Sequence, residues 1–389
     1  MPSTHTLHAA VEHLGRLIAF PTVSSDSNLA LIAYAAEHLE RLGARIRLDH
    51  DATANKANLF ATLGPEQDGG IVLSGHSDVV PVAGQAWHSD PFQMLARDDK
   101  LYGRGSCDMK GFIACCLAMA PDFAGLTPSR PLHIALTYDE ETGCLGGKAL
   151  IDTLRRQGLQ PALCWVGEPT GMKLIEGHKG CCHYTTEFTG LGGHSSKPER
   201  GVNAVEYAVQ FAVKLLQLRD ALKTRRPADS RFTPPYSTLQ LGRLQGGIAH
   251  NVIPNQASLA WEIRPISAAD GDYVREAITR YARETLCPEM QRTHPDADIV
   301  THTIGEVAGL APEPASAALA MMAELTGQTH ADMVAFATEA GLFQAYGVST
   351  IICGPGAIEQ AHQPDEFVSR RQLADCLDVL EKLKPQLTA

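Results

Sequence analysis

The sequence lacks three features that would assign it to common classes of protein. No apolar run approaches the roughly 20 residues that a transmembrane helix needs, and no Cys-x-x-Cys pair occurs among the ten cysteines. Basic residues are in deficit, 33 against 44 acidic ones, which gives a formal charge of −11. These absences argue against a membrane partner, against a zinc-ribbon or thioredoxin-type site, and against a nucleic-acid partner.

We expect no secretory signal peptide, because the first twenty residues have neither a basic start nor a continuous apolar core. Instead Leu7, Val11 and Leu14 have the spacing of one face of a helix. The cysteines are expected to be reduced thiols, most of them buried as small apolar side chains. With 389 residues and 44% hydrophobic composition, the chain is predicted to be a cytoplasmic enzyme of two or three domains.

The pattern of helices and strands divides the chain into two kinds of region. Helix-like and strand-like segments alternate over 1–180 and again over 305–389, which predicts one discontinuous α/β domain with helices on both faces of its sheet. The intervening 181–304 has a different order. Its strands are expected at 181–189, 236–245, 256–263 and 299–304, and its helices at 203–219 and 271–285. That β-α-β-β-α-β order is typical of a ferredoxin-like α+β domain inserted into the first.

A strand-like run, "IVLSGHSDVVP", ends abruptly in two polar side chains, His76 and Asp78. Residues two apart on a strand point to the same face, and the carboxyl edge of an α/β sheet is where ligands bind. Three interpretations are open for this pair. It could be half of a catalytic relay, a metal ligand with its orienting partner, or a polar pair that caps the strand.

Further ligand-type side chains follow other predicted strands. They are Asp108 in "GRGSCDMKG", Glu140 and Glu141 in "TYDEETG", Glu168 in "VGEPT", and His362 in "GPGAIEQAHQPDE". Each alone has a plain interpretation: a helix N-cap, a solvated pair, a turn and a surface histidine, respectively. Together they would meet at one sheet edge, and imidazole with carboxylate suits zinc and related divalent ions.

This series of motifs resembles the M20 family of dinuclear metallopeptidases and amidohydrolases, over essentially the whole chain. The resemblance implies a zinc-peptidase-like mixed sheet covered by helices, with the inserted domain acting as lid and dimerisation domain of a homodimer. It also implies two divalent ions per chain, with zinc or cobalt as the metal. His76, Asp108 and Glu168 would hold one ion. Asp108, Glu141 and His362 would hold the other.

The resemblance assigns roles to three further residues. Glu140 would be the general base that takes a proton from the attacking water, and Asp78 would orient His76. His194, in "GGHSSKPERG", would reach across from the partner subunit to stabilise the oxyanion; judged locally, it is a loop-capping histidine. Cys107 lies beside Asp108, but we interpret it as a packing residue because the family's ligand sets contain no sulfur.

Three residues are candidates for substrate binding. Asn251 in "NVIPN" and Arg264 in "WEIRP" match lid residues of the family that bind polar groups of the substrate, although locally they are a turn asparagine and a strand-end arginine. Glu339 in "FATEAGLFQ" could match a substrate ammonium group, or could merely favour the first turn of the following helix.

Within the family, "EGHKG", "FATEAGLFQ" and "CGPGAIEQAHQPDE" are most similar to the branch that hydrolyses N2-acetyl-L-ornithine to L-ornithine and acetate in arginine biosynthesis. The expected substrate is therefore a small N-acyl amino acid. One alternative within the family is desuccinylation of N-succinyl-diaminopimelate or hydrolysis of another N-acyl amino acid. An alternative of a different class is a catalytically silent metal- or ligand-binding protein.

Overall fold

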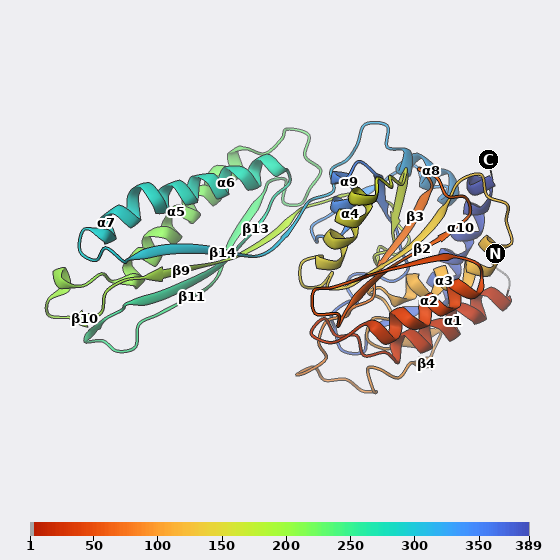
Figure 1. Cartoon of the computed structure of the whole chain (residues 1–389), viewed down its shortest axis with the longest axis horizontal. Helices are drawn as coiled ribbons and strands as arrows, with labels where there is room; N and C mark the ends of the chain where they lie inside the picture. Colours follow the sequence, from red (N-terminus) through yellow and green to blue (C-terminus); the bar gives the residue numbers. More distant parts are fainter. Residues whose placement is uncertain (1–3, 389) are drawn as a thin grey trace. The chain divides into compact units, whose positions relative to one another are not determined.

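A computed structural model describes residues 4–388 and divides the chain into two compact units (Figure 1). The first unit runs up to Gly177 and also contains Pro312–Met333 and the chain from Thr338 onward. The second comprises His178–Ala311 and the short segment Val334–Ala337. The insertion predicted from the sequence, 181–304, is shorter by a few residues at each end than His178–Ala311. No helix within the described residues is both long and apolar enough to cross a membrane.

The first unit is built on an eight-stranded mixed sheet of order β1-β2-β6-β3-β7-β16-β8-β15. Its strands are β1 (Arg45–His50), β2 (Ala57–Leu63), β3 (Ile71–His76), β6 (Leu132–Thr137), β7 (Leu163–Val166), β8 (Ile175–His178), β15 (Asp332–Val334) and β16 (Ser349–Ile352). Strand β3 is parallel to β6 and to β7, whereas β1, β2 and β6 pair antiparallel. The parallel strands therefore present their carboxyl ends at one edge.

Helices cover both faces of this sheet, as predicted. They are α1 (Thr4–Ile18), α2 (Leu29–Arg41), α3 (Lys110–Ala124), α4 (Leu145–Gln157), α8 (Ala317–Thr326), α9 (Ala340–Ala345) and α10 (Arg370–Thr388). On β3, Ser74 bonds to Glu339 at the start of α9, while the adjacent Gly75 faces Ile113 of α3. Because successive strand residues face opposite sides, α3 and α9 lie on opposite faces.

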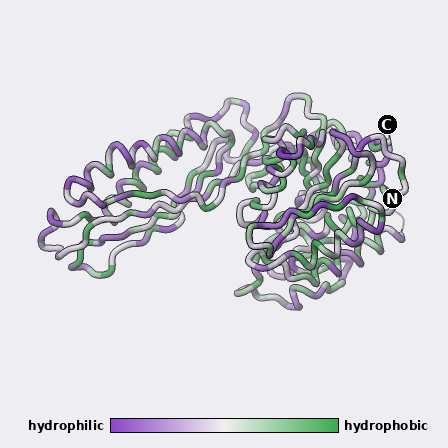
Figure 2. Tube along the Cα trace, viewed as in Figure 1, coloured by the Kyte–Doolittle hydropathy of each residue, from purple (hydrophilic) through white to green (hydrophobic). Residues whose placement is uncertain are grey.

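Helix α3 is the centre of the larger core. Every residue from Lys110 to Ala120 is buried, as expected for a helix that is apolar all round. It packs against α1 and α10 on its outer side and against β3 on its inner side. Figure 2 shows apolar stretches running through the interior of this unit. A small sheet of β4 (Leu95–Arg97), β5 (Lys100–Tyr102) and β17 (Phe367–Ser369) completes it.

The second unit has the predicted ferredoxin-like order. Its elements are β9 (Cys181–Thr189), α5 (Ala204–Thr224), β11 (Thr238–Gly246), β13 (Gln256–Arg264), α6 (Ala268–Tyr281), α7 (Cys287–Gln291) and β14 (Asp298–Val307). The antiparallel sheet runs β11-β13-β9-β14. Along β9, buried residues such as Cys182 and Tyr184 alternate with less buried ones such as His183. One face of the sheet thus packs in the second core, and the other carries polar side chains.

Candidate metal centre

Five side chains of the first unit form two adjoining groups with the geometry of metal sites. In one group, ligand atoms of His76, Asp108 and Glu168 all lie within 4.8 Å of one another; in the other, the same holds for Asp108, Glu141 and His362. These are the two sets expected from the sequence, with Asp108 shared. His76 ends β3, while Glu141 follows β6 and Glu168 follows β7, so the carboxyl ends of parallel strands bring them together.

His76 is held by its backbone surroundings with Nε2 directed at two carboxylates. Its Nδ1–H donates to the main-chain carbonyl of Asp78 at 2.9 Å, while Nε2 lies 3.0 Å from Asp108 Oδ1 and 3.9 Å from Glu168 Oε1. The Asp78 carboxylate is 3.7 Å from Nδ1. The hydrogen bond of the ring thus goes to the Asp78 carbonyl, while the carboxylate predicted to orient His76 lies beside the same nitrogen. Either partner fixes the ring so that Nε2 can bind a metal.

The Asp78 carboxylate also holds the segment that carries the glutamate pair. Its Oδ1 accepts the backbone N–H of Glu140 at 3.0 Å, and Oδ2 accepts that of Glu141 at 3.4 Å and the hydroxyl of Ser24 at 2.6 Å. Because one carboxylate binds both N–H groups, the two glutamates keep a fixed position relative to His76. Glu140 belongs to neither ligand group, and its Oε1 lies 3.5 Å from Cys144 Sγ.

The second histidine completes the group around Asp108. His362 Nε2 lies 3.1 Å from Glu141 Oε1 and 3.3 Å from Asp108 Oδ2. The Asp108 and Glu141 carboxylates raise the pKa of His362 to about 10. Burial would raise the pKa of Asp108, but hydrogen bonds from the two histidines outweigh it and hold that pKa below its usual range.

Burial of so many carboxylates favours a bound cation. It raises the pKa values of Glu140, Glu141 and Glu168, which means that the charged forms are poorly solvated there. Glu168 Oε1 is buried and has no hydrogen-bond partner. Unpaired buried carboxylate oxygens are costly, and a divalent ion would satisfy them, so the donor set fits the two ions that the sequence implies. Imidazole and carboxylate ligands suit zinc-class ions.

A buried glutamate that the sequence did not single out positions Asp108. Glu366 Oε1 accepts the backbone N–H groups of Cys107 at 2.8 Å and Asp108 at 3.0 Å, and Oε2 accepts from Arg104 at 2.6 Å. Asp108 itself does not cap α3, whose N-cap residue is Met109. The sequence segment "HQPDE" contains Glu366, but nothing in it distinguishes this residue from its neighbours.

Cys107 behaves as a packing residue. Its side chain is fully buried, and Sγ lies 3.3 Å from the carbonyl of Ala357. Burial raises the pKa of this thiol well above its usual value, which disfavours the thiolate that metal binding needs. It is in neither of the two ligand groups of the first unit.

Glu339 lies in the first unit with both carboxylate oxygens engaged. Its side chain is fully buried and accepts hydrogen bonds from Ser74 Oγ at 2.6 Å and Thr137 Oγ1 at 2.8 Å. Burial raises its pKa. Although Glu339 is the N-cap residue of α9, its side chain makes no capping bond. The bonds that it does make tie Ser74 of β3 and Thr137 at the end of β6 to the start of α9.

The remaining predicted residues lie in the second unit. His194, on β10 (Gly193–His194), pairs with Val252 of β12 (Val252–Ile253), and the Ser195 N–H donates to the Asn251 carbonyl at 3.2 Å. The loops of His194 and Asn251 are therefore neighbours. His194 Nδ1 lies 2.8 Å from Ser196 Oγ and accepts the Ser196 N–H at 3.2 Å; these are the contacts of a loop-capping histidine.

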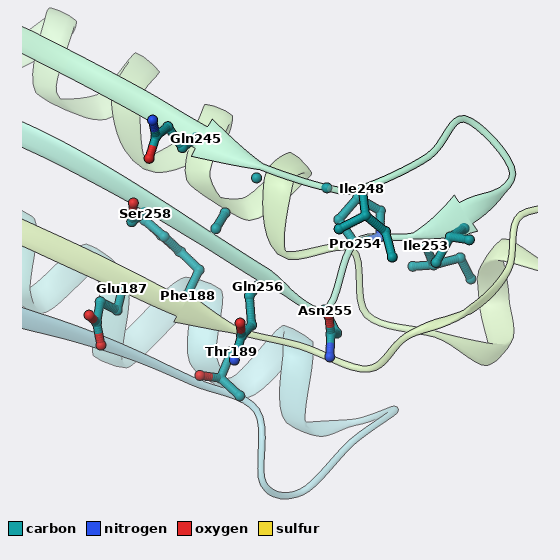
Figure 3. Close-up of a pocket in the computed structure, with 14 residues that line it drawn as sticks. Glu187, Phe188, Thr189, Gln245, Ile248, Ile253, Pro254, Asn255, Gln256 and Ser258 are labelled. Carbon is teal, nitrogen blue, oxygen red and sulfur yellow. The ribbon is translucent and has the colours of Figure 1, made fainter.

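A pocket lies near these loops in the second unit. It is lined by the ends of β9 and β11 and by the segment around Pro254, with Gln245, Ile248 and Asn255 among its walls (Figure 3). None of the site residues predicted from the sequence lines it. Arg264 is at the end of β13, where its Nε donates to Glu262 Oε1 at 3.4 Å.

Comparison with known proteins agrees with the geometry of the site. Residues 72–384 match the family model described as peptidase family M20/M25/M40. An acetylornithine deacetylase of Salmonella heidelberg (strain SL476) is 36% identical over 368 residues, which cover 93% of each chain.

Two solved structures show the same fold. The aminopeptidase PepT of Bacillus cereus superposes with a TM-score of 0.72 at 19% identity, covering 98% of both chains. A protein of Bacillus subtilis described as a dinuclear metal-binding peptidase of the M20 family superposes with a TM-score of 0.65 at 14% identity, covering 99% of both.

Proposed function

We propose a substrate for this chain, which belongs to peptidase family M20 and is an amidohydrolase. The proposed reaction is the hydrolysis of N2-acetyl-L-ornithine to L-ornithine and acetate. The observation that carries the proposal is the 36% identity to a curated acetylornithine deacetylase over 93% of both chains. The two ligand groups that share Asp108 supply the chemical basis for amide hydrolysis.

We further propose that His76, Asp108 and Glu168 hold one divalent ion and that Asp108, Glu141 and His362 hold the second, with zinc or cobalt as the metal. When bound, such a pair supplies positive charge that makes water nucleophilic at neutral pH and polarises the amide carbonyl. The description of the Bacillus subtilis protein as a dinuclear metal-binding peptidase supports a pair of ions in this fold.

In this mechanism Glu140 acts as general base and then as general acid. Its carboxylate takes a proton from the attacking water and returns it to the nitrogen of the departing amine. Burial raises the pKa of Glu140 toward the pH at which the enzyme operates. A carboxyl group with such a pKa can both accept a proton and return it. Asp78 fixes the backbone of Glu140 throughout.

The second unit would supply substrate contacts in a cytoplasmic homodimer. We propose that His194 of one protomer donates a hydrogen bond to the oxyanion in its partner's site, and that Asn251 and Arg264 bind polar groups of the substrate. Arg264 contacts the Glu262 carboxylate through Nε, and its side chain is about one-third exposed, so its guanidinium can take a further acceptor.

The test is a substrate panel with the zinc-loaded full chain, followed by release of free amine. We expect N2-acetyl-L-ornithine to give the highest kcat/KM among acetylornithine, acetylnorvaline, N-succinyl-diaminopimelate and a dipeptide. The Glu140→Gln chain is the matched negative control. Preference for the succinyl substrate would identify a desuccinylase instead. Absence of turnover with two ions bound would favour a metal- or ligand-binding protein.

A further inference from the structure

A third group of ligand-type side chains lies on the polar face of the sheet in the second unit. Cys181 and His183 are two residues apart on β9 and so point to the same side. Glu262 of β13 is directly opposite His183 in the antiparallel register. Cys182, between the first two, points the other way and is buried in the core. The strand pairing therefore brings a thiol, an imidazole and a carboxylate together.

The contacts within this group meet at one atom. His183 Nε2 lies 3.2 Å from Cys181 Sγ and 3.1 Å from Glu262 Oε2. A ring nitrogen either carries one hydrogen or offers one lone pair, so it cannot make a linear hydrogen bond to both partners. A cation can be bound by lone pairs of all three atoms at once.

The same arrangement recurs in the candidate metal centre of the first unit. There, His362 Nε2 faces carboxylate oxygens of Asp108 and Glu141 at 3.3 and 3.1 Å. In all three groups the ligand atoms lie within 4.8 Å of one another. The group on β9 and β13 differs in its sulfur and in its carboxylate, since the Glu262 side chain is 26% exposed whereas those of Asp108 and Glu141 are 8% and 9% exposed.

We propose that Cys181, His183 and Glu262 form a third metal site, which takes a zinc-class divalent ion through thiolate, imidazole and carboxylate. Bonds of about 2.0–2.3 Å in a tetrahedral site put ligand atoms roughly 3.4–3.6 Å apart. The two distances to His183 Nε2 are within a few tenths of an ångström of this spacing, and the third pair of atoms lies within 4.8 Å. Arg264 engages Glu262 Oε1 and leaves Oε2 for the ion. Water completes the coordination, as is usual where a protein supplies three ligands.

Cobalt(II) tests this site separately from the catalytic pair, because only a sulfur ligand gives an intense thiolate-to-cobalt charge-transfer band. The ligands of the first unit are nitrogen and oxygen alone. The full chain, kept reduced, is titrated with cobalt and followed by near-ultraviolet absorption and by counting bound metal. We expect the wild type to develop the band and to bind one equivalent more than Cys181→Ser, which should show no band.

Cys182→Ala is the matched control, since its sulfur lies on the opposite face of the same strand; it should retain the band. His183→Ala should weaken cobalt binding at this site while Cys181 remains. The proposal is overturned if the wild type shows no thiolate band in excess cobalt, or if the band persists in Cys181→Ser. Retention of two equivalents by Cys181→Ser would show that the variant is folded.

Discussion

The carboxylate of Asp78 accepts the backbone N–H of Glu140 at 3.0 Å, across 62 residues of sequence. The main-chain carbonyl of the same aspartate accepts a hydrogen bond from His76 Nδ1–H. One residue therefore fixes both a proposed metal ligand and the proposed general base, through two different groups. Its carboxylate accepts the N–H of the base, and its carbonyl accepts the hydrogen bond from the ligand.

This division predicts the behaviour of Asp78→Asn. Each carboxylate oxygen of Asp78 accepts one backbone N–H of the glutamate segment. Asparagine replaces one of these oxygens by an NH₂ group, which cannot accept, so one of the two hydrogen bonds is lost. We expect kcat to fall by about tenfold or more, corresponding to about 1.4 kcal/mol per factor of ten, with two metals retained. Ser24→Ala, which removes only the hydroxyl donor to Oδ2, should have a smaller effect in the same direction. Loss of metal in Asp78→Asn would instead show that the carboxylate supports His76.

The Glu140→Gln variant should bind two metals and lose nearly all turnover. General base catalysis contributes about 10²–10⁴-fold, and glutamine cannot accept the proton. Metal analysis and steady-state kinetics on the same preparation measure both properties. As a control, Glu141→Gln should lose metal, since Glu141 belongs to a ligand group. The reverse pattern would mean that the two glutamates exchange roles.

A mixing experiment tests whether His194 acts across a dimer. His194→Ala and Glu140→Gln chains are each expected to be inactive. In a heterodimer, the Glu140→Gln protomer would supply His194 to the site of the other protomer, whose Glu140 is intact. Part of the wild-type activity should then return, as measured by amine release after subunit exchange. If exchange is confirmed and activity stays absent, His194 serves its own chain or only its loop.

Glu339→Gln separates substrate selection from support of the sheet. The sequence suggested a match to the ornithine ammonium, but both carboxylate oxygens accept hydroxyl hydrogen bonds from β3 and β6. We therefore expect the variant to lower kcat/KM for acetylornithine and for uncharged acetylnorvaline in parallel, together with thermal stability. A loss confined to acetylornithine, well over tenfold as for removal of one partner of a buried charge pair, would assign Glu339 to specificity.

His133 should make the first unit sensitive to acid. Burial lowers its pKa from 6.5 to about 4, so the unfolded chain takes up a proton below pH 6.5 whereas the folded protein does not until about pH 4. The stability due to the neutral ring is thus complete above pH 6.5 and is lost between pH 6.5 and 4, by roughly 2 kcal/mol at pH 5. Urea unfolding of metal-free protein at pH 7.5 and 5 should show a smaller loss for His133→Gln. Equal losses in the two proteins would contradict this assignment.

The sequence predicted the strands well where apolar runs or alternation were clear. The expected strand 181–189 coincides with β9. The five proposed ligands could be singled out because each ends or follows a strand, or lies in a loop rich in ligand-type residues, and the structure brings them together. Element ends were less predictable: α5 continues to Thr224, five residues past its expected end at 219, since Leu222 still contributes to its buried face.

Contacts made over long stretches of sequence were not predictable from local patterns. The bonds from Asp78 to the glutamate segment and from Glu366 to the Asp108 loop join positions that carry no local sign of each other. Glu339 shows the same limit, because a buried glutamate and an exposed one at a helix start have the same local sequence signal. Only the packing of β3, β6 and α9 distinguishes them.

The hydrogen bond from the Asp108 loop to Glu366 also bears on biosynthesis. The two residues are 258 positions apart, and the entire second unit is translated between them. His362, a proposed ligand, also comes from this last part of the chain. A nascent chain that has been translated past Glu168 but not to His362 therefore lacks the imidazole of the second ligand group. It also lacks Glu366, whose carboxylate fixes the Asp108 loop. Acquisition of the proposed pair of ions therefore requires translation past Glu366, so metal loading reports that both parts of the first unit have been made.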